Sequence, residues 1–212
     1  MTDKTAIPFQ TEARRRGRPR SDDTRQAILR AAYELLEEGG MARFTIEGVA
    51  ERSGAAKTTI YRWWPSKGVL AMEAYHAEVA ATLSITDGPS AIADLHKLLH
   101  LMAQVFASKT GRVLAGLIAE GQTDPDTLAA YREGVLEPRR DAVRRILRRG
   151  IVSGELRGDL DLDATMDAFY GALLARLLLK YAPIDDAYAD RLADTVLRGI
   201  AAEGALSPAH SS

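Results

Sequence analysis

The sequence predicts an all-α protein of about nine helices. Apolar residues recur three and four positions apart along most of the chain, which is the period of an amphipathic helix. Short breaks rich in Gly, Pro, Asp and Ser separate these segments. No segment alternates apolar and polar residues as a half-buried strand does, and no repeat of fixed period occurs. We expect helices over residues 22–40, 45–53, 57–63, 66–83, 92–106, 112–120, 124–153, 162–181 and 185–203.

Several helix ends carry local signals. Asp22 and Asp23 suit the positive N-terminal end of the first helix dipole, and Gly39-Gly40 should end that helix. Thr45 is a good N-cap for the second helix. Pro138 lies inside the seventh segment, and we expect it to kink or divide that helix.

Charge is distributed unevenly along the chain. Residues 1–67 carry 13 Lys and Arg against 9 Asp and Glu, a net charge of +4, whereas residues 68–212 have a net charge of −5. The segment Arg14–Arg20 contains five arginines and no acidic residue. A basic front half indicates that this part of the chain meets a polyanion.

Composition excludes several classes of protein. The chain has no cysteine, so a disulfide framework, a thiolate zinc site and a Cys nucleophile are excluded. We see no apolar signal segment, and Asp167 and Arg176 interrupt the most apolar run, so we expect a cytoplasmic protein without a membrane span. No catalytic triad, phosphate-binding loop or carboxylate pair stands out, so we expect neither an enzyme nor a cofactor.

Two short helices separated by a turn of small residues predict a helix-turn-helix unit. On the second of them, Ile60 and Trp64 share a face that can pack inward, whereas Thr58 and Arg62 lie on the opposite face. A short helix with one packed face and one polar face suits the major groove of DNA. The alternative at this point is two surface helices of an ordinary bundle.

Residues 22–70 resemble the DNA-binding domain of the TetR family of repressors. The matching stretches are Phe44–Ala50, then Ser53-Gly54, then Lys57–Lys67, and the resemblance covers roughly a quarter of the chain. It implies a flexible basic arm (residues 1–20), a helix-turn-helix domain (21–67), a helical domain for ligand sensing and dimerisation (68–204) and a disordered tail (205–212).

The resemblance also implies roles for individual residues. Phosphates would be held by Thr45, Tyr61 and Lys67, and base edges would be read by Lys57, Thr58 and Thr59, with Arg62 and Trp63 beside them. Trp63 would contact the DNA backbone or simply pack beside its neighbour. The chain departs from the family at Ala56, which cannot cap the recognition helix as serine does. It also departs at Glu47, which would accept a hydrogen bond from a cytosine amine or face solvent.

Two arginine-rich segments have open interpretations. Gly17–Arg20 resembles the core of an AT-hook, in which Arg16, Arg18 and Arg20 would enter a narrow minor groove. The alternative is a basic tail that contacts phosphates. The second segment, Arg139–Arg149, would be a solvated face paired with acidic residues, or a helix that binds a membrane surface or DNA.

The ligand pocket of the family lies among helices four to eight. The resemblance therefore makes pocket candidates of Tyr75, His76, His96, His100, Met102, Phe106 and Tyr131, although most of them could equally be core. His96 and His100 are one helical turn apart and could share a metal ion. Because neither Asp94 nor His76 supplies a third ligand at convincing spacing, we predict no metal site.

The last two helices suit a dimer interface. The apolar run 164–179 has no polar face, and such a helix needs neighbours on every side. The resemblance implies a four-helix bundle between two copies, built from Phe169, Leu173, Leu177, Leu192, Val196 and Ile200. The alternative is a helix that is merely central to its own domain.

Together these features predict a homodimeric, ligand-responsive DNA-binding regulator. The resemblance implies a repressor that a small-molecule inducer releases from a palindromic operator in double-stranded DNA. An architectural DNA-binding protein without ligand sensing and a carrier of apolar ligands are the alternatives. The ligand and the operator sequence are not encoded in any pattern we find.

Overall fold

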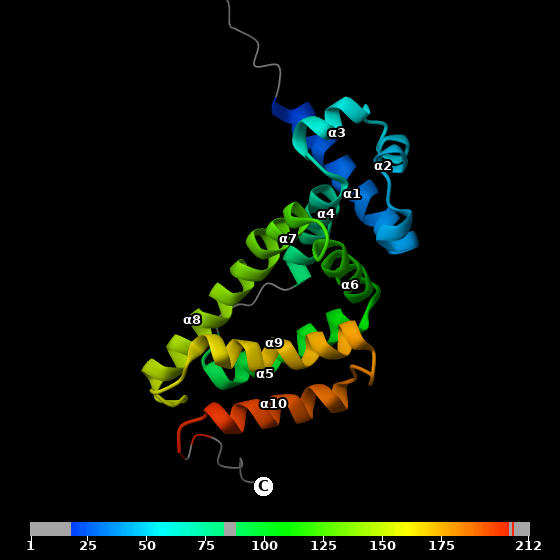
Figure 1. Ribbon diagram of the computed structural model, residues 1–212. Coiled ribbons are helices and arrows are strands. Elements are labelled where there is room, and N and C mark those ends of the chain that lie inside the picture. Colours follow the sequence, from blue (N-terminus) through cyan, green and yellow to red (C-terminus); the bar gives the residue numbers. More distant parts are fainter. Residues whose placement is uncertain (1–17, 83–87, 204, 206–212) are drawn as a thin grey trace, which may run out of the picture.

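The computed structural model describes residues 18–82, 88–203 and 205, and within these ranges every regular element is helical (Figure 1). This confirms the all-α prediction. The helices are α1 (Arg18–Arg43), α2 (Ile46–Ser53), α3 (Lys57–Trp63), α4 (Lys67–Thr82), α5 (Ala91–Ala107), α6 (Lys109–Gly121), α7 (Pro125–Tyr131), α8 (Glu137–Ser153), α9 (Leu162–Leu179) and α10 (Asp186–Ile200), with a π turn, η1 (Arg132–Leu136), between α7 and α8. No helix among the described residues is long and apolar enough to cross a membrane.

The first helix begins earlier than predicted. It starts at Arg18 instead of Asp22, so the end of the predicted basic arm is helical. Arg16 lies outside the described residues, and of Arg18 and Arg20 only the backbone is described. At the other end, Gly40 has φ +62° and interrupts the helical geometry before the final turn to Arg43, as the double glycine predicts.

The predicted seventh helix is divided at η1, close to Pro138. Proline has no backbone N–H, so it cannot donate to the carbonyl four residues before it. Just ahead of it, the N–H of Glu137 reaches the carbonyl of Arg132, five residues back, and the helix widens into one π turn. The division therefore has a local cause that the sequence shows.

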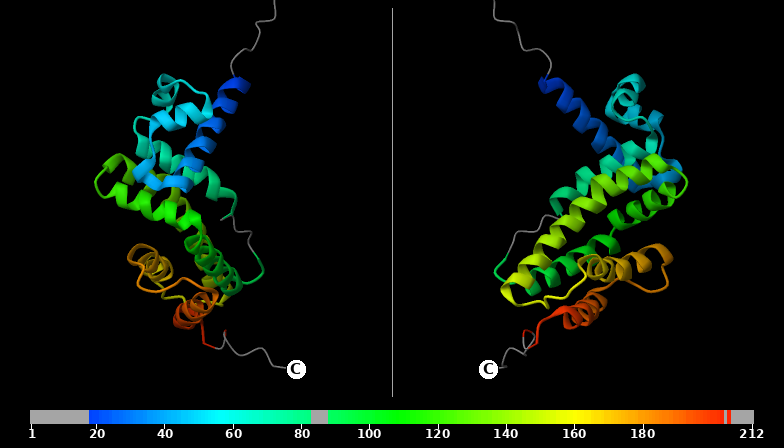
Figure 2. Two further views of the ribbon diagram at one scale, coloured as in Figure 1. Left: turned by 90° about the vertical axis from the view of Figure 1, so that its right-hand side faces the viewer. Right: turned by 60° about the vertical axis from the view of Figure 1, so that its left-hand side comes forward.

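The helices form two groups that α4 connects. In Figure 1, α1, α2 and α3 gather at one end, and α5, α9 and α10 lie at the other. Helix α4 packs against α1, α6 and α7, and α10 packs against α5 and α9 (Figure 2). Beyond the first group, the rest of the molecule therefore contacts α1 mainly through α4 and α6.

Glu155 ties the end of α8 to the start of α5. Its carboxylate accepts hydrogen bonds from the Ser90 hydroxyl (2.5 Å), the backbone N–H groups of Ala91 (3.1 Å) and Ile92 (3.3 Å), and the Ser153 hydroxyl (2.9 Å). Desolvation opposes ionisation, but these hydrogen bonds outweigh it and lower the pKa of Glu155 to about 2. The ionised carboxylate is thus preferred in the folded state.

We predict that Glu155→Ala destabilises the protein only above acidic pH. Because the pKa is lowered on folding, the stabilisation is complete above the ordinary value of 4.5 and is lost as pH falls towards 2. Urea unfolding at pH 7 should show that the variant has a free energy of unfolding about 1–2 kcal/mol below that of the wild-type protein. This difference between the two proteins should become smaller below about pH 4. Glu133→Ala, at an exposed position, is the control. A gap of equal size at pH 7 and pH 3 would contradict this role.

Candidate DNA-binding interface and sensor domain

Helix α3 is anchored by one face and exposes the other. Ile60 and Trp64 are 0% and 1% exposed, and they pack in the same core as Ile28 and Val49. Lys57, Thr58 and Arg62 are exposed, and Tyr61 keeps 53% of its surface exposed. The predicted division into an inner apolar face and an outer polar face is confirmed. A rigid helix can therefore present hydrogen-bonding side chains to a groove of DNA.

Thr45 caps α2 and still has a proton to offer. Its side-chain oxygen accepts a hydrogen bond from the backbone N–H of Gly48 at 3.1 Å, as the N-cap prediction requires. A hydroxyl accepts through lone pairs and donates through its hydrogen, so capping leaves the donor available. An exposed hydroxyl that is held in place in this way suits a phosphate oxygen. By contrast, Ala56 caps α3 without any side-chain hydrogen bond, as its side chain dictates.

Glu47 and Lys57 form an exposed ion pair between α2 and α3. Lys57 Nζ lies 2.7 Å from Glu47 Oε1. The hydrogen bond from Lys57 lowers the pKa of Glu47, and the same bond raises the pKa of Lys57. Glu47 therefore has a cationic partner, and the Lys57 ammonium, which has three N–H donors, keeps two of them for other acceptors.

Trp63 lies between packing and exposure. It is half-buried, and its ring meets the Trp64 ring edge-on with centroids 5.5 Å apart. The Arg62 guanidinium stacks over the Trp63 ring at 5.5 Å from its centroid. These contacts favour the packing interpretation of Trp63. They also hold Arg62 close to the surface of α3, and cation–π stacking of this kind restrains a flexible side chain.

Glu73 of α4 joins the DNA-binding helices to the connecting helix. Its carboxylate accepts a hydrogen bond from the indole Nε1 of Trp64 at 2.5 Å and pairs with the guanidinium of Arg25 on α1. The Arg25 guanidinium also lies 5.8 Å from the centroid of the Trp64 ring. Sequence analysis did not find this cluster, although a charged residue inside the apolar pattern of α4 is a visible signal.

The start of α4 contacts α6 and α7 at two points. Lys67, a predicted phosphate contact, forms an ion pair with Glu120 at the end of α6, with N and O 3.5 Å apart. Gly68 is buried against α7, where a Cβ atom would lie only 1.7 Å from Thr127 Oγ1. Thr127 in turn donates to Asp124 Oδ2 at 2.6 Å. Only glycine lets α4 approach α7 this closely.

With this geometry established, comparison with known proteins places the chain. Residues 28–74 match the family described as bacterial regulatory proteins of the tetR family, and residues 85–196 match a Tetracyclin repressor-like C-terminal domain. The second match alone spans half of the chain. The chain belongs to the TetR family. It is thus a DNA-binding transcriptional regulator, and this family is not enzymatic.

Individual relatives agree along nearly the whole length. The regulator is 35% identical over 191 residues to the HTH-type transcriptional regulator YdeS of Bacillus subtilis, covering 90% of this chain and 96% of YdeS. It is 30% identical over 187 residues to the DNA-binding transcriptional repressor TetR of Mycobacteroides abscessus, covering 88% and 98% of the two chains. The crystal structure of the TetR family transcription regulator SCO0332 matches with a TM-score of 0.74 and 39% identity, covering 84% and 98%.

The structure separates the predicted pocket residues into three places. Tyr131 acts electrostatically on both Tyr75 and Tyr170, and Arg139 acts on all three hydroxyls. Burial raises the pKa of Tyr75 and of Tyr170 to about 12, and Arg139 acts in the opposite direction. We call these four residues the tyrosine cluster. Tyr170 and Arg139 are not among the predicted pocket residues, because Tyr170 lies 39 positions beyond Tyr131 and Arg139 belongs to the arginine-rich segment that was interpreted as a paired surface.

Met102 and Phe106 are buried on α5. Met102 and Tyr170 line an apolar hollow of about 10 Å³ together with Leu95, Leu98, Leu99, Val143, Phe169 and Leu173. That space holds a water molecule at most, so the hollow is closed to larger ligands in this conformation. His76 lies elsewhere, in a groove of about 310 Å³ between α4 and α7 that Glu133 and Met72 also line.

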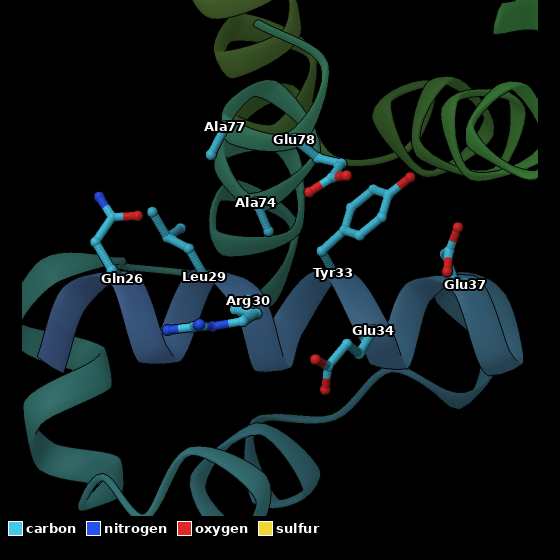
Figure 3. Close-up of a pocket in the computed structure, with 9 residues that line it drawn as sticks. All are labelled: Gln26, Leu29, Arg30, Tyr33, Glu34, Glu37, Ala74, Ala77 and Glu78. Atoms are coloured by element: carbon cyan, nitrogen blue, oxygen red, sulfur yellow. The ribbon is translucent and has the colours of Figure 1, made fainter. Parts of the chain in front are cut away.

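A wider groove of about 500 Å³ runs between α1 and α4 (Figure 3). Its lining includes Tyr33 and three acidic residues, Glu34, Glu37 and Glu78. Burial raises the pKa of Tyr33, and the charges of Glu37 and Glu78 add to this effect. The Tyr33 hydroxyl lies 2.9 Å from Thr110 Oγ1 on α6, so it joins α1 to α6.

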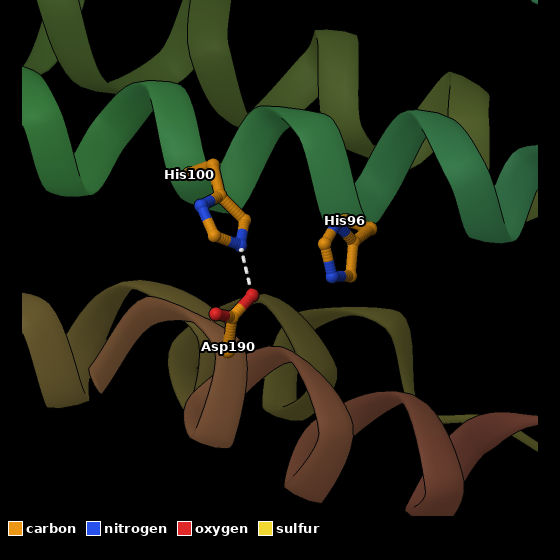
Figure 4. A group of neighbouring side chains, drawn as sticks. All are labelled: His96, His100 and Asp190. Atoms are coloured by element: carbon orange, nitrogen blue, oxygen red, sulfur yellow. Dashed lines mark ion pairs between the residues drawn. The ribbon is translucent and has the colours of Figure 1, made fainter. Parts of the chain in front are cut away.

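His96 and His100 lie at the boundary of α5 and α10, away from the tyrosine cluster. Their rings stack with centroids 4.7 Å apart, and Asp190 of α10 lies beneath them (Figure 4). Sequence analysis overlooked Asp190 because it is about ninety positions further along the chain. Asp94, the acidic residue considered there, pairs instead with Arg149 and accepts from the N–H of Gly88.

Three of the six arginines of α8, namely Arg140, Arg144 and Arg149, form ion pairs with acidic residues of the described chain. Arg140 contacts Asp163 and Asp167 at 3.1 Å and 2.6 Å, and Arg144 contacts Asp163 at 2.8 Å. These pairs hold α8 against the start of α9. Acidic pairing was expected for this segment, but Arg140 and Arg144 are only 16% and 23% exposed, so their side of α8 is not a solvated face.

The predicted dimer residues differ in how far they are buried within a single chain. Phe169, Leu173 and Leu177 are 6%, 0% and 6% exposed within a single chain, and Ile200 is also buried. Side chains that are already buried have little surface left for a partner, so these four belong to the protomer core. The sequence pattern showed that α9 is apolar all round but not which side its own domain covers. Leu192 and Val196 are only partly buried.

Proposed function

We propose that this TetR-family regulator is a homodimeric repressor that a small-molecule inducer releases from a palindromic operator. The observation that carries the proposal is the geometry of α3. Its inner face is anchored by the buried Ile60 and Trp64, and its outer face exposes a row of polar side chains. A twofold dimer would place two such helices in successive major grooves, about 34–36 Å apart. The curated description of the M. abscessus relative as a repressor supports the direction of control.

The dimer interface follows from the uncovered side of α9. Ala168 and Gly171 are exposed there, and Leu178 and Leu179 are 38% and 72% exposed. The opposite side of the same helix is buried in the protomer. The exposed side of α9 is an apolar surface of small and aliphatic residues, and its contact with water is removed when a second copy of the chain covers it. Leu192 and Val196 of α10 extend this surface.

Release by an inducer would use the contacts between α4 and the sensor domain. The tyrosine cluster offers hydroxyl groups and a guanidinium within an apolar interior, which suits a ligand with both polar and apolar parts. Because the adjoining hollow is closed, a ligand has to displace helices to enter. Movement of α7 or α8 would reach α3 through Gly68 and Glu73 of α4. Such a switch requires that the ligand binds the moved state more tightly.

The proposal predicts two different effects of substitution on α3. Tyr61→Ala should weaken binding to every operator variant by about tenfold, because a phosphate contact carries no base information. Thr58→Ala should change which bases are preferred, because a base contact is worth about 1–3 kcal/mol of discrimination. Operator fragments selected from the organism's own DNA supply the probes, and gel shifts at fixed salt measure both effects.

Matched controls are available on the same chain. Tyr181→Ala replaces a tyrosine that is 63% exposed, and Thr123→Ala replaces an exposed threonine outside the DNA-binding helices. Neither should change operator binding. If the α3 variants alter all operator sequences alike, the division into base and phosphate contacts is wrong. If the protein prefers no genomic fragment over random duplex, the repressor proposal fails and a nonspecific architectural role replaces it.

A further inference from the structure

We propose that His96, His100 and Asp190 form a binding site for a divalent transition-metal ion between α5 and α10. Figure 4 shows both imidazoles projecting from α5 towards α10, where Asp190 forms an ion pair with His100 and His96 lies to one side. Each of the three side chains offers one donor atom, and these atoms all lie within 4.8 Å of one another. This inference does not depend on DNA binding, so its outcome is separate from that of the proposed function.

The helices position the donors independently of any ion. His96 and His100 are four residues apart and therefore lie one turn apart on the same face of α5, with rings inclined by 28°. Asp190 follows Ala189, whose burial fixes the rotation of α10 about its axis. Because α10 packs along α5, the carboxylate is brought to the two rings by helix packing alone.

The surroundings of His100 favour a metal over a simple hydrogen bond. Its Nε2 atom is enclosed and has no hydrogen-bond partner among the described residues. Nevertheless, Asp190 Oδ1 lies 2.9 Å away. The two atoms form an ion pair when His100 is protonated, and the neutral imidazole and the carboxylate can instead both bind one cation at this place. The His100 and Asp190 side chains are 23% and 64% exposed, so an ion has a path from solvent.

Two imidazoles and one carboxylate define the class of ion. Imidazole suits zinc, copper, iron and nickel, whereas magnesium and calcium prefer oxygen ligands alone. Zinc bonds of about 2.0–2.1 Å in a tetrahedral site place donors roughly 3.3 Å apart. Two donor atoms that are as far apart as 4.8 Å, the upper limit of the separations in the group, therefore have to approach each other by about 1.5 Å when the ion binds. Rotation of a half-buried histidine covers that distance. Three protein ligands leave at least one position for water.

Zinc titration of the full-length, tag-free protein tests the site. Isothermal titration calorimetry should give one Zn²⁺ per chain, and the melting temperature should rise with zinc. His96→Ala and Asp190→Asn should each weaken zinc binding at least about tenfold, because loss of even an outer partner costs that much. Co²⁺ should give the visible absorption of a tetrahedral site in the wild-type protein and not in these variants.

The controls replace the two remaining histidines of the chain, in His76→Ala and His210→Ala. Both variants should bind zinc as the wild-type protein does. Asp190→Asn changes an exposed side chain, so it tests the site even if His100→Ala fails to fold. The proposal is overturned if His96→Ala and Asp190→Asn bind zinc normally. It is overturned equally if the controls lose as much affinity, because zinc then binds adventitiously.

Discussion

Gly68→Ala is expected to destabilise the protein and to weaken operator binding. The new methyl group would lie 1.7 Å from Thr127 Oγ1 and 3.0 Å from Asp124 Oδ2. Thr127 is completely buried and is held by its hydrogen bond to Asp124, so it cannot turn aside without losing that bond. Overpacking of this kind costs about 1–3 kcal/mol, and we expect the upper half of that range by urea unfolding.

A second substitution identifies the cause. Thr127→Ala removes the atom that the new methyl group meets, so the double variant Gly68→Ala/Thr127→Ala should be more stable than the sum of the single effects predicts. Gly116→Ala on α6 is the control, because its Cβ would have its nearest neighbour at 3.9 Å. That variant should be neutral or slightly more stable, since alanine favours a helix. Simple additivity in the double variant would show that the cost arises elsewhere.

The same substitution should reduce operator affinity. Gly68 follows the ion-paired Lys67 at the start of α4, directly after the corner that orients α3. A displacement of α4 from α7 therefore changes the angle at which α3 is presented. Fluorescence anisotropy with operator DNA should show at least a tenfold loss under conditions where circular dichroism shows that the variant is folded. Unchanged affinity would mean that the contact between α4 and α7 does not orient α3.

Glu73→Ala is expected to have an effect of similar size. The substitution leaves the indole N–H of Trp64 without its acceptor in a side chain that is only 1% exposed. An unsatisfied buried donor costs about 1–3 kcal/mol. The exposed pair with Arg25 adds little to this, because ion pairs near solvent are worth less than about 1 kcal/mol. The melting temperature and the affinity for operator DNA should both fall.

Two further variants separate the hydrogen bond from the charge. Glu73→Gln retains a carbonyl oxygen for Trp64 and should keep most of the stability. In Trp64→Phe the donor is absent, so Glu73→Ala in that background should cost much less than in the wild-type protein. An undiminished cost there would contradict the hydrogen bond as the cause. Operator affinity in Glu73→Gln then reports whether the negative charge itself is needed.

Much of the fold was predictable because its signals are local. Thr45 is the predicted N-cap, the helix divides beside Pro138, and Ile60 and Trp64 face inward. Each of these features depends on neighbours within about one helical turn. The helix ends were less accurate: α1 begins four residues early, and α10 ends at Ile200 instead of Glu203. Ends fray because their last hydrogen bonds contribute little.

The candidate sites were only partly predictable. The exposed row of polar side chains on α3 was predicted from the spacing of its apolar and polar residues and from the family resemblance. The tyrosine cluster contains Tyr75 and Tyr131 as expected, but Tyr170 and Arg139 join it from α9 and α8. The buried side of α9 could not be chosen from a helix that is apolar all round. The side that faces a partner in our proposal is consequently different from the one the sequence pattern suggested.

The amino-acid sequence by itself determined the all-α class, the helix-turn-helix and the family of this regulator. The reason is that caps, breaks and a 3.6-residue period act over a few neighbouring residues. Only the tertiary structure decided that Glu73 holds Trp64, that Gly68 meets Thr127, and that Asp190 joins His96 and His100. These partners are far apart in the chain, and their meeting depends on how whole helices pack against one another.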